Sequence, residues 1–180
     1  HSLEVPLSGS TDLLRVAEPG LGIPGEPAHP EHLLHVRVGV AVAVVEDTDR
    51  IISSDFKAAG NFVYLLGTTL DEMGGSEYFR QLGLSGGRVP RVLVLKSLSI
   101  MQRLSAATQK HLVKSCHDLS DGGLGVALAE MAFGGGLGAN IDLAKVCLEE
   151  GLHRDDIILF SQSNSRFLCE VDPSKSIEFE

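Results

Sequence analysis

The sequence predicts an α/β fold in which helices pack on a mixed β-sheet around one core. Two observations carry this prediction. Short runs rich in valine, isoleucine and leucine alternate along the chain with segments in which apolar residues recur every three or four positions. The composition is that of an ordinary globular domain, since 43% of the 180 residues are hydrophobic, 22% are charged and 5% are aromatic.

The N-terminal 35 residues are predicted to be an arm or linker ahead of a domain that spans residues 36–180. Five of the seven prolines lie there, a density that interrupts helix and strand periods. The chain begins at His1 without an initiator methionine, so we expect a cut piece of a longer protein with non-native first residues. His29, His32 and His35 are either a metal cluster or part of a flexible arm, and Pro30 favours the arm because it breaks an aligning helix.

The first half of the domain is predicted to contain two buried strands and two helices. β-branched residues separated by small ones predict a strand at 36–45, and residues 62–67 predict a second that pairs with it like a hairpin across a turn at 55–61. Residues 51–52 are a candidate short strand. Ser76 can cap a short helix, glycines and Pro90 then form a loop, and three- and four-residue spacings predict an amphipathic helix over 92–113.

The second half is predicted to alternate in the same way. A helix over 124–133 is stopped by three glycines, and residues 140–143 are strand-like. Residues 152–160 fit either a helix or a strand, whereas residues 166–171 alternate as a strand should. Asp172 and Pro173 then open another helix, and the chain stops so soon afterwards that we expect the native domain to be truncated here.

The charge balance and the cysteines limit the class of partner and the compartment. The formal charge of −9 disfavours binding to nucleic acid or anionic lipid, so any phosphate site must be local. The longest apolar run, residues 36–45, is too short to cross a bilayer. The cysteines form no CxxC pair, which favours a reducing, cytoplasmic setting over a disulfide or zinc framework: Cys116, Cys147 and Cys169.

The strongest local motif is Ser120-Asp121-Gly122-Gly123, which we expect to link a helix ending near Ser115 to the next helix. Backbone N–H groups in such a turn, together with the positive end of the following helix, can hold a phosphate. Asp118 and Asp121 would repel a bare phosphate, so they would coordinate magnesium, form a turn or cap, or position a hydroxyl. The alternative is that Ser120 and Asp121 only cap the helix.

For several other polar residues, the sequence is compatible with either a ligand contact or a structural role. Gly74-Gly75-Ser76 is either a second phosphate turn or a capped helix start. Arg166 is either a phosphate or sugar contact or a surface ion pair, and Lys57 is either a ligand contact or part of a solvated turn. A relay of Cys116, His117 and Asp118 is disfavoured because successive side chains diverge.

Four segments in order resemble a known family. The run from His117 to Leu124, followed by residues 127–133, is similar to the C-terminal-type domain of the aminoimidazole ribonucleotide synthase superfamily. The other matching segments lie within residues 45–57, 65–78 and 159–167. Within the superfamily, the run from Gly74 to Tyr78 is similar to the phosphoribosylformylglycinamidine synthase family, and selenophosphate synthetases, thiamine-monophosphate kinases and hydrogenase maturation proteins lack it.

The resemblance implies an ATP- and magnesium-dependent ligase step of purine synthesis. Glutamine-derived ammonia converts formylglycinamide ribonucleotide to its amidine through a phosphorylated imidate. The implied partners are this ribonucleotide, a preceding N-terminal-type synthetase domain and a glutamine amidotransferase subunit or domain. The residues expected to face the nucleotide or sugar phosphate are Gly74, Gly75, Ser76, Asp118, Ser120, Asp121, Gly122 and Gly123. The alternative is a non-catalytic nucleotide-binding or assembly module of the same superfamily.

The resemblance also implies what this piece lacks. The catalytic histidine and most magnesium-binding acids of the family lie in the N-terminal-type domain, so we expect no catalytic residue and no synthetase activity in this chain alone. Faces that would meet that domain should make the chain prone to self-association. Family members often carry glutamate where Gln162 stands, which changes the charge expected there.

Overall fold

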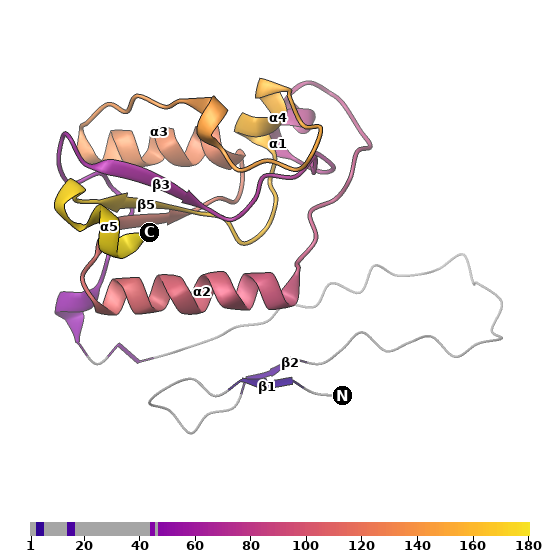
Figure 1. Ribbon diagram of the computed structural model, residues 1–180. Coiled ribbons are helices and arrows are strands. Elements are labelled where there is room, and N and C mark those ends of the chain that lie inside the picture. The colour runs from indigo at the N-terminus through magenta and orange to yellow at the C-terminus, as the bar shows by residue number, and fades with distance from the viewer. Residues whose placement is uncertain (1–2, 6–13, 17–43, 46) are drawn as a thin grey trace. The chain divides into compact units, whose positions relative to one another are not determined.

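The computed structural model describes residues 3–5, 14–16, 44–45 and 47–180 (Figure 1). The chain divides into two units, His1–Val44 and Val45–Glu180. In the first unit β1 (Leu3–Val5) pairs antiparallel with β2 (Leu14–Val16). The arm predicted without regular structure therefore contains two short strands, because its prolines flank them and do not interrupt them. The candidate histidines and most of the strand predicted at 36–45 lie outside the described residues.

The second unit is built on an antiparallel three-stranded sheet of order β3-β5-β4. In this sheet β3 (Phe62–Leu66) and β4 (Val113–Asp118) flank β5 (Phe167–Val171). Leu66 and Asp118 both lie opposite Phe167, so β3 and β4 end at the edge where β5 begins. An isolated parallel bridge joins Thr69 to Leu148. The α/β fold and the strands expected at 62–67 and 166–171 are confirmed.

Two helices sandwich this sheet (Figure 1). α3 (Gly123–Gly135) covers one face, where Leu124, Ala127 and Met131 join Leu168 in the main core cluster. α2 (Val94–Gln109) covers the other face, where Leu104 and Ala107 pack on a cluster containing Cys169 and Val171. Because successive strand residues point to opposite faces, β5 supplies Leu168 to α3 and Cys169 to α2. Both predicted helices are thereby confirmed, with ends displaced by a few residues.

Strand β4 is the largest departure from the predicted elements. Residues 115–118 were expected to connect a helix to the glycine turn, yet they form a strand. Because these residues are mostly polar, their sequence does not show the alternation of apolar and polar residues that predicts a strand. Ser115 is fully buried, and its Oγ donates a hydrogen bond to Oε2 of Glu170 at 2.8 Å, so the buried hydroxyl is satisfied. The described partner of β3 is β5, and the hairpin partner expected at 36–45 lies mostly outside the described residues.

The remaining elements are short. α1 (Glu77–Gln81) follows Ser76, α4 (Asp155–Phe160) resolves the ambiguous segment as a helix, and α5 (Ser176–Phe179) follows the 3-10 turn that Asp172 caps. Further 3-10 turns span Thr48–Arg50 and Leu143–Lys145.

The short strands expected at 51–52 and 140–143 are wrong. Asp142 accepts a hydrogen bond from the backbone of Ala144 and thereby opens a turn instead. Residues 51 and 52 are extended but belong to no strand. None of the helices in the described part of the chain is long and apolar enough to span a bilayer.

Candidate functional site

Two glycine-containing turns meet beside the sheet edge where β5 begins. The first glycine turn, Gly74–Ser76, leads into α1, and the second glycine turn, Ser120–Gly123, leads from β4 into α3. The side chain of Gln162 joins them. With its amide oxygen facing both turns, it accepts hydrogen bonds from the backbone N–H of Glu77 at 3.1 Å and of Gly122 at 2.9 Å. The two turns are therefore neighbours in space.

The first glycine turn is closed by its own side chain. Oγ of Ser76 accepts a hydrogen bond from the N–H of Phe79 at 3.2 Å, and Ser76 is only 1% exposed. The N–H of Gly74 donates to the carbonyl of Arg88 at 2.7 Å. Of the two alternatives for this turn, the structure shows the capped helix start, in which Ser76 has taken a donor that an anion would need.

The second glycine turn is open in the sense that none of its own side chains caps the helix that follows. Gly122 is the N-cap of α3 with φ +79°, and no side chain caps this helix. The alternative in which Ser120 or Asp121 caps α3 is therefore wrong, and both residues are exposed. A Cβ on Gly123 would lie 2.4 Å from the carbonyl oxygen of Ser161, so only glycine allows this close approach. At the buried start of this 13-residue helix the N–H of Gly122 donates to Gln162, and the N–H of Gly123 donates to the carbonyl of Ser120 at 3.1 Å.

An open pocket of about 790 Å³ lies beside the second glycine turn. Its polar lining includes Asp118, Ser120 and Asp121. Its apolar lining includes Pro90 and Val92, which precede α2, and Met101 within α2. The remaining lining residues are Ser97, Leu119, Gln162, Asn164, Ser165, Arg166 and Phe167. This volume suits a nucleotide-sized ligand.

The loop 161–165 that carries Gln162 is held from inside by Arg166. Arg166 is 1% exposed, and its guanidinium donates to the carbonyl of Ser163 at 3.0 Å, to Oγ1 of Thr69 at 3.0 Å and to the carbonyl of Ser161. Burial lowers the pKa of Arg166 to about 10, and the nearby carboxylate of Glu72 opposes that shift. Arg166 is therefore still protonated at neutral pH and acts as a brace between two loops.

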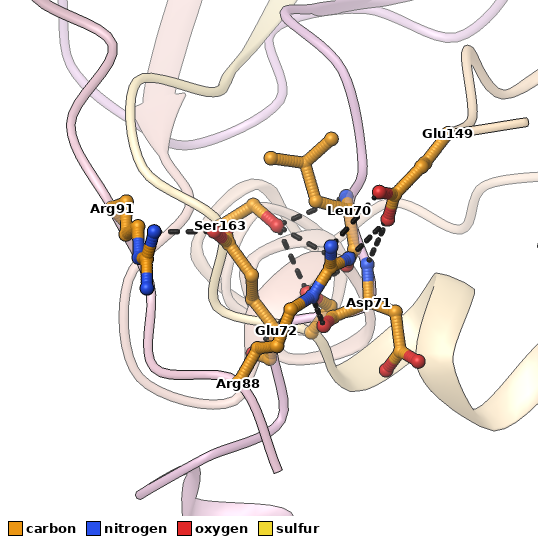
Figure 2. Close-up of polar contacts among 8 residues, drawn as sticks. Leu70, Asp71, Glu72, Arg88, Arg91, Glu149 and Ser163 are labelled. Carbon is orange, nitrogen blue, oxygen red and sulfur yellow. Dashed lines mark hydrogen bonds and ion pairs between the residues drawn. The ribbon is translucent and has the colours of Figure 1, made fainter.

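Serine hydroxyls add to this brace (Figure 2). Oγ of Ser163 accepts a hydrogen bond from the N–H of Leu70 at 3.0 Å, and Oγ of Ser161 donates to the carbonyl of Leu70 at 2.7 Å. Glu72 is 4% exposed and accepts from the N–H of Arg91 at 3.2 Å, while its other oxygen has no hydrogen-bond partner among the described residues. Its negative charge faces the side on which Arg166 is buried.

An ion pair between Arg88 and Glu149 holds the neighbouring segment at Asp71 (Figure 2). Arg88 bonds both carboxylate oxygens of Glu149, and its Nε donates to the carbonyl of Asp71 at 2.8 Å. Oε2 of Glu149 also accepts from the N–H of Asp71 at 3.0 Å. The Arg88 hydrogen bond is the main reason that the pKa of Glu149 falls to about 2.

Residues 58–179 match the family model described as AIR synthase related protein, C-terminal domain. The chain belongs to this family. Curated relatives include the phosphoribosylformylglycinamidine synthase subunit PurL of Alkaliphilus metalliredigens, 39% identical over 133 residues, which cover 73% of this chain and 17% of the relative. The same protein of Limosilactobacillus reuteri is 39% identical over 157 residues, covering 87% of this chain and 19% of the relative. The chain thus spans less than a fifth of these relatives.

Solved structures show the same fold. A structure of T. maritima PurL complexed with FGAR matches with a TM-score of 0.64 at 22% identity, covering 73% of this chain and 23% of that chain. T. maritima PurL complexed with ATP matches with a TM-score of 0.56 at 23% identity, covering 73% and 20%. The hydrogenase maturation protein HypE of E. coli matches at 0.50 and 19% identity, covering 72% and 40%.

This AIR synthase related domain brings together most of the residues predicted to form a site. Asp118, Ser120, Asp121 and Arg166 all line the pocket, and Gly122 is tied to the first glycine turn through Gln162. The guanidinium of Arg166 is directed into the protein, where its hydrogen bonds go to Thr69, Ser161 and Ser163.

Lys57 is not part of this assembly. Its Nζ pairs with Asp55 at 2.6 Å, and its N–H donates to Oε2 of Glu170 at 2.8 Å. Glu170 lies three residues along β5 from Phe167, a separation of about 10 Å at the usual strand rise. Burial raises the pKa of Glu170, but hydrogen bonds from Asn61 and from the surrounding N–H and hydroxyl donors outweigh burial and lower it overall. Lys57 thus supports the opposite end of the sheet.

The two candidate metal-binding residues could hold magnesium only if a bound phosphate supplied further oxygen atoms to the ion. Asp118 and Asp121 are exposed and line one side of the pocket. In residues 47–180 and the other described positions, no three His, Cys, Asp or Glu residues are grouped closely enough to hold a metal. Magnesium commonly binds through one or two carboxylates plus phosphate oxygens, so this donor set suits a magnesium nucleotide better than a free ion.

The relay of neighbouring residues is ruled out by the strand. Sγ of Cys116 lies 3.9 Å from Sγ of Cys169 in the cluster beneath α2, and the hydrogen bond from Cys169 lowers the pKa of Cys116. His117 lies 3.1 Å from the carboxylate of Glu130 on α3. Cys116 and His117 therefore point to opposite faces of β4.

Sequence reasoning missed two features of the pocket. Gln162 was noted for its charge and not as the link between the glycine turns, although the polar run 161–165 was a visible signal. Met101 was expected to lie on the apolar side of its helix, yet it is 50% exposed and faces the pocket.

Proposed function

We propose that this chain is a domain of a phosphoribosylformylglycinamidine synthase and that its second glycine turn forms part of a phosphate-binding cleft. The observation that carries the proposal is that Asp118, Ser120 and Asp121, which lie at the end of β4 or between β4 and α3, line a nucleotide-sized pocket. The PurL relatives support the choice of this enzyme within the superfamily. The structures of T. maritima PurL with FGAR and with ATP support a cleft for phosphate-bearing ligands in this fold.

The proposed reaction activates an amide oxygen with ATP and replaces it with ammonia derived from glutamine. The role of this chain is to bind and orient phosphate groups. The exposed backbone at Ser120 and Asp121 would donate to phosphate oxygens, while the carboxylates of Asp118 and Asp121 would hold a magnesium ion shared with them. When bound, magnesium would neutralise part of the negative charge of the phosphates. The braced loop around Arg166 keeps Gln162, and with it the turn, in place.

The groups that perform the chemistry are proposed to lie elsewhere in the parent protein. Its preceding N-terminal-type domain would complete the cleft, and a glutamine amidotransferase subunit or domain would deliver ammonia; a solved T. maritima assembly named PurLQS supports a multi-subunit arrangement. The chain alone is therefore expected to be inactive and to self-associate, and the cytoplasm remains the predicted compartment.

A second candidate is a module that holds a nucleotide without turnover. The arrangement that favours it is the Gln162 amide, which already occupies the N–H of Gly122 and ties the open turn to the closed one. Such a bridge suits a rigid structural element as well as a substrate cleft.

Calorimetric titration separates the two candidates. The chain and its full-length parent would each be titrated with ATP and magnesium and with formylglycinamide ribonucleotide, and turnover with glutamine would be measured for the parent. The ligase proposal expects a Gly122→Ala parent to lose both affinity and turnover. Unchanged turnover with lost nucleotide binding would establish the structural module, and unchanged binding of both ligands would exclude any phosphate site at this turn.

A further inference from the structure

Two of the three cysteines face each other across neighbouring strands of the sheet. Cys116 on β4 lies directly opposite Cys169 on β5, and their sulfur atoms are 3.9 Å apart. Side chains that lie opposite each other project from the same face of a sheet. Cys169 is part of the apolar cluster beneath α2, and Cys116 packs against it. The proposed phosphate cleft gives these two thiols no role.

The hydrogen-bond pattern brings the two backbones close together at this pair. The N–H of Cys116 donates to the carbonyl of Ser53 at 3.1 Å, so it points away from β5. Three residues farther along, the N–H of Leu119 donates to the carbonyl of Arg166 at 3.0 Å. Bonded and non-bonded pairs alternate along antiparallel strands, so Cys116 and Cys169 form a non-bonded pair, in which Cα atoms lie about 4.5 Å apart. Disulfides span Cα distances of roughly 4.4–6.8 Å, so this backbone accepts a bond between the two sulfurs.

The three thiols differ in exposure. Cys169 is fully buried, whereas Cys116 is half-buried. A small oxidant therefore reaches Cys116 first, and the thiol of Cys169 already donates a hydrogen bond to the Cys116 sulfur. Cys147 is exposed, and its Sγ lies 3.8 Å from Oγ1 of Thr68. A reaction that begins at Cys116 thus has a second sulfur in place.

We propose that Cys116 and Cys169 form a reversible disulfide when the protein meets a hydroperoxide. With hydrogen peroxide, the Cys116 thiol loses its proton and its sulfur attacks one oxygen. The O–O bond breaks, which leaves a sulfenic acid on Cys116 and releases water. The sulfur of Cys169 then attacks the sulfenic sulfur, the S–O bond breaks, and the departing hydroxide takes the Cys169 thiol proton to form a second water. The thiols lose two electrons to the peroxide, and a dithiol reductant returns them by exchange.

The bond would join the two strands close to the pocket. Asp118 and Phe167 lie two residues farther along from Cys116 and Cys169, opposite each other, and both line the pocket. A cross-link at the cysteine pair therefore holds together the strand ends that carry these pocket residues. A reversible bond is the form that suits the predicted reducing compartment, where disulfides are usually transient.

A peptide map identifies every pairing of the cysteines. Trypsin places them in three separate peptides, 115–145, 146–154 and 167–175. The reduced chain is treated with hydrogen peroxide, once folded in buffer and once unfolded in urea, and the remaining thiols are blocked before digestion and mass spectrometry. In the unfolded chain the bond between Cys147 and Cys169 should dominate, because that pair encloses the shortest loop and loop-closure entropy favours it.

The proposal expects the folded chain to link Cys116 to Cys169 alone, at a rate independent of protein concentration, and dithiothreitol to restore both thiols. Cys169→Ser should leave a sulfenic acid on Cys116 that dimedone captures. Cys116→Ser should keep Cys169 reduced, because the buried thiol is then without the half-buried sulfur that reacts first. Cys147→Ser is the matched control at an exposed position and should leave the yield of the cross-link unchanged.

Four outcomes overturn the proposal. The first is a folded chain that gives the same mixture of pairings as the unfolded chain. The second is oxidation of Cys116 to a sulfinic acid while Cys169 stays reduced, which would put the second sulfur out of reach. The third is a link that forms only between chains and grows with protein concentration. The fourth is a pair that does not react until urea unfolds the chain. The wild-type map decides all four, so the result does not depend on the folding of any variant.

Discussion

The two glycine turns look alike in the sequence and differ in the folded protein. Each places a Gly-Gly pair directly before or at the start of a helix, and Gln162 bonds the backbone of both regions. The first glycine turn ends in a serine that caps α1 and is itself buried. The second has no cap and borders a pocket. A glycine motif is therefore a candidate ligand site where its polar side chains stay exposed beside a pocket and do not cap the helix.

The surroundings of the turns differ as much as their caps. Gly74 donates to the carbonyl of Arg88, so the first glycine turn is bonded to the chain that follows it. The second packs its buried glycine backbone on the carbonyl of Ser161, while Ser120 and Asp121 of the same turn are exposed and line the pocket. In the first turn Ser76 is the buried side chain and Gly75 is exposed.

The largest expected effect comes from removing the brace that serves both turns. Arg166→Met should lower the free energy of unfolding by about 3–5 kcal/mol, because three buried oxygen acceptors and the Glu72 carboxylate lose their cationic partner. Urea unfolding followed by circular dichroism measures this loss. Arg154→Met removes an exposed, ion-paired arginine and should change stability little. Equal effects of the two substitutions would mean that Arg166 does not brace the loop.

The next largest effect is expected from alanine substitutions in the two turns, at glycines that share the same backbone conformation. Gly75 and Gly122 both have φ +79°, so alanine at either position should cost about 1–2 kcal/mol of backbone strain. A Cβ on Gly75 meets no atom within 4 Å, whereas one on Gly122 lies 2.2 Å from Cγ2 of Val126. Gly122→Ala should therefore cost about 1–3 kcal/mol more than Gly75→Ala, measured as a difference in unfolding free energy.

A double variant checks the cause of that difference. Val126→Ala removes the overlapping methyl groups, so in the Gly122→Ala background it should recover part of the lost stability. Additive losses from the two substitutions would show that the contact with Val126 is not the reason.

A smaller effect compares the serines of the two turns. Ser76→Ala should destabilise the protein by about 1 kcal/mol because it removes the cap of α1. Ser120→Ala should stay within about 0.5 kcal/mol, since Ser120 is exposed and caps no helix. Thermal unfolding of both variants measures the contrast, and a larger loss for Ser120→Ala would reverse the assignment of closed and open turns.

The smallest effect concerns the ion pair outside the first glycine turn. The pKa of Glu149 is about 2 in the folded protein, below its ordinary value of 4.5, mainly because of Arg88. A lowered carboxyl pKa stabilises the fold above pH 4.5, and this contribution disappears as the pH falls toward 2. The stability difference between the wild-type protein and Glu149→Gln should therefore shrink across that interval in urea titrations.

A charge control accompanies this experiment. Glu150→Gln removes one negative charge from the exposed neighbouring position. If it reproduced the same pH dependence, net charge and not the Arg88 pair would explain the result.

The sequence by itself determined the features that depend on neighbouring residues. The strands at 62–67 and 166–171 and the long helices follow from periodicity, and the cap at Ser76 follows from residue type and position. The open second turn could be recognised as a glycine-rich helix start, although sequence alone left capping by Ser120 or Asp121 open. These features could be predicted because the forces that produce them act over a few residues.

Only the tertiary structure decided which distant residues meet. Strand β4 is hidden in the sequence by Ser115, whose burial is tolerated because Glu170 accepts a hydrogen bond from its hydroxyl. Arg166 lies inside because Oγ1 of the distant Thr69 accepts a hydrogen bond from it, and Lys57 lies at the far end of the sheet because its N–H donates to Glu170. Gln162 joins two turns that are far apart in the chain. The free energy of a buried polar group depends on the partners that folding brings to it, and those partners are not its neighbours in sequence.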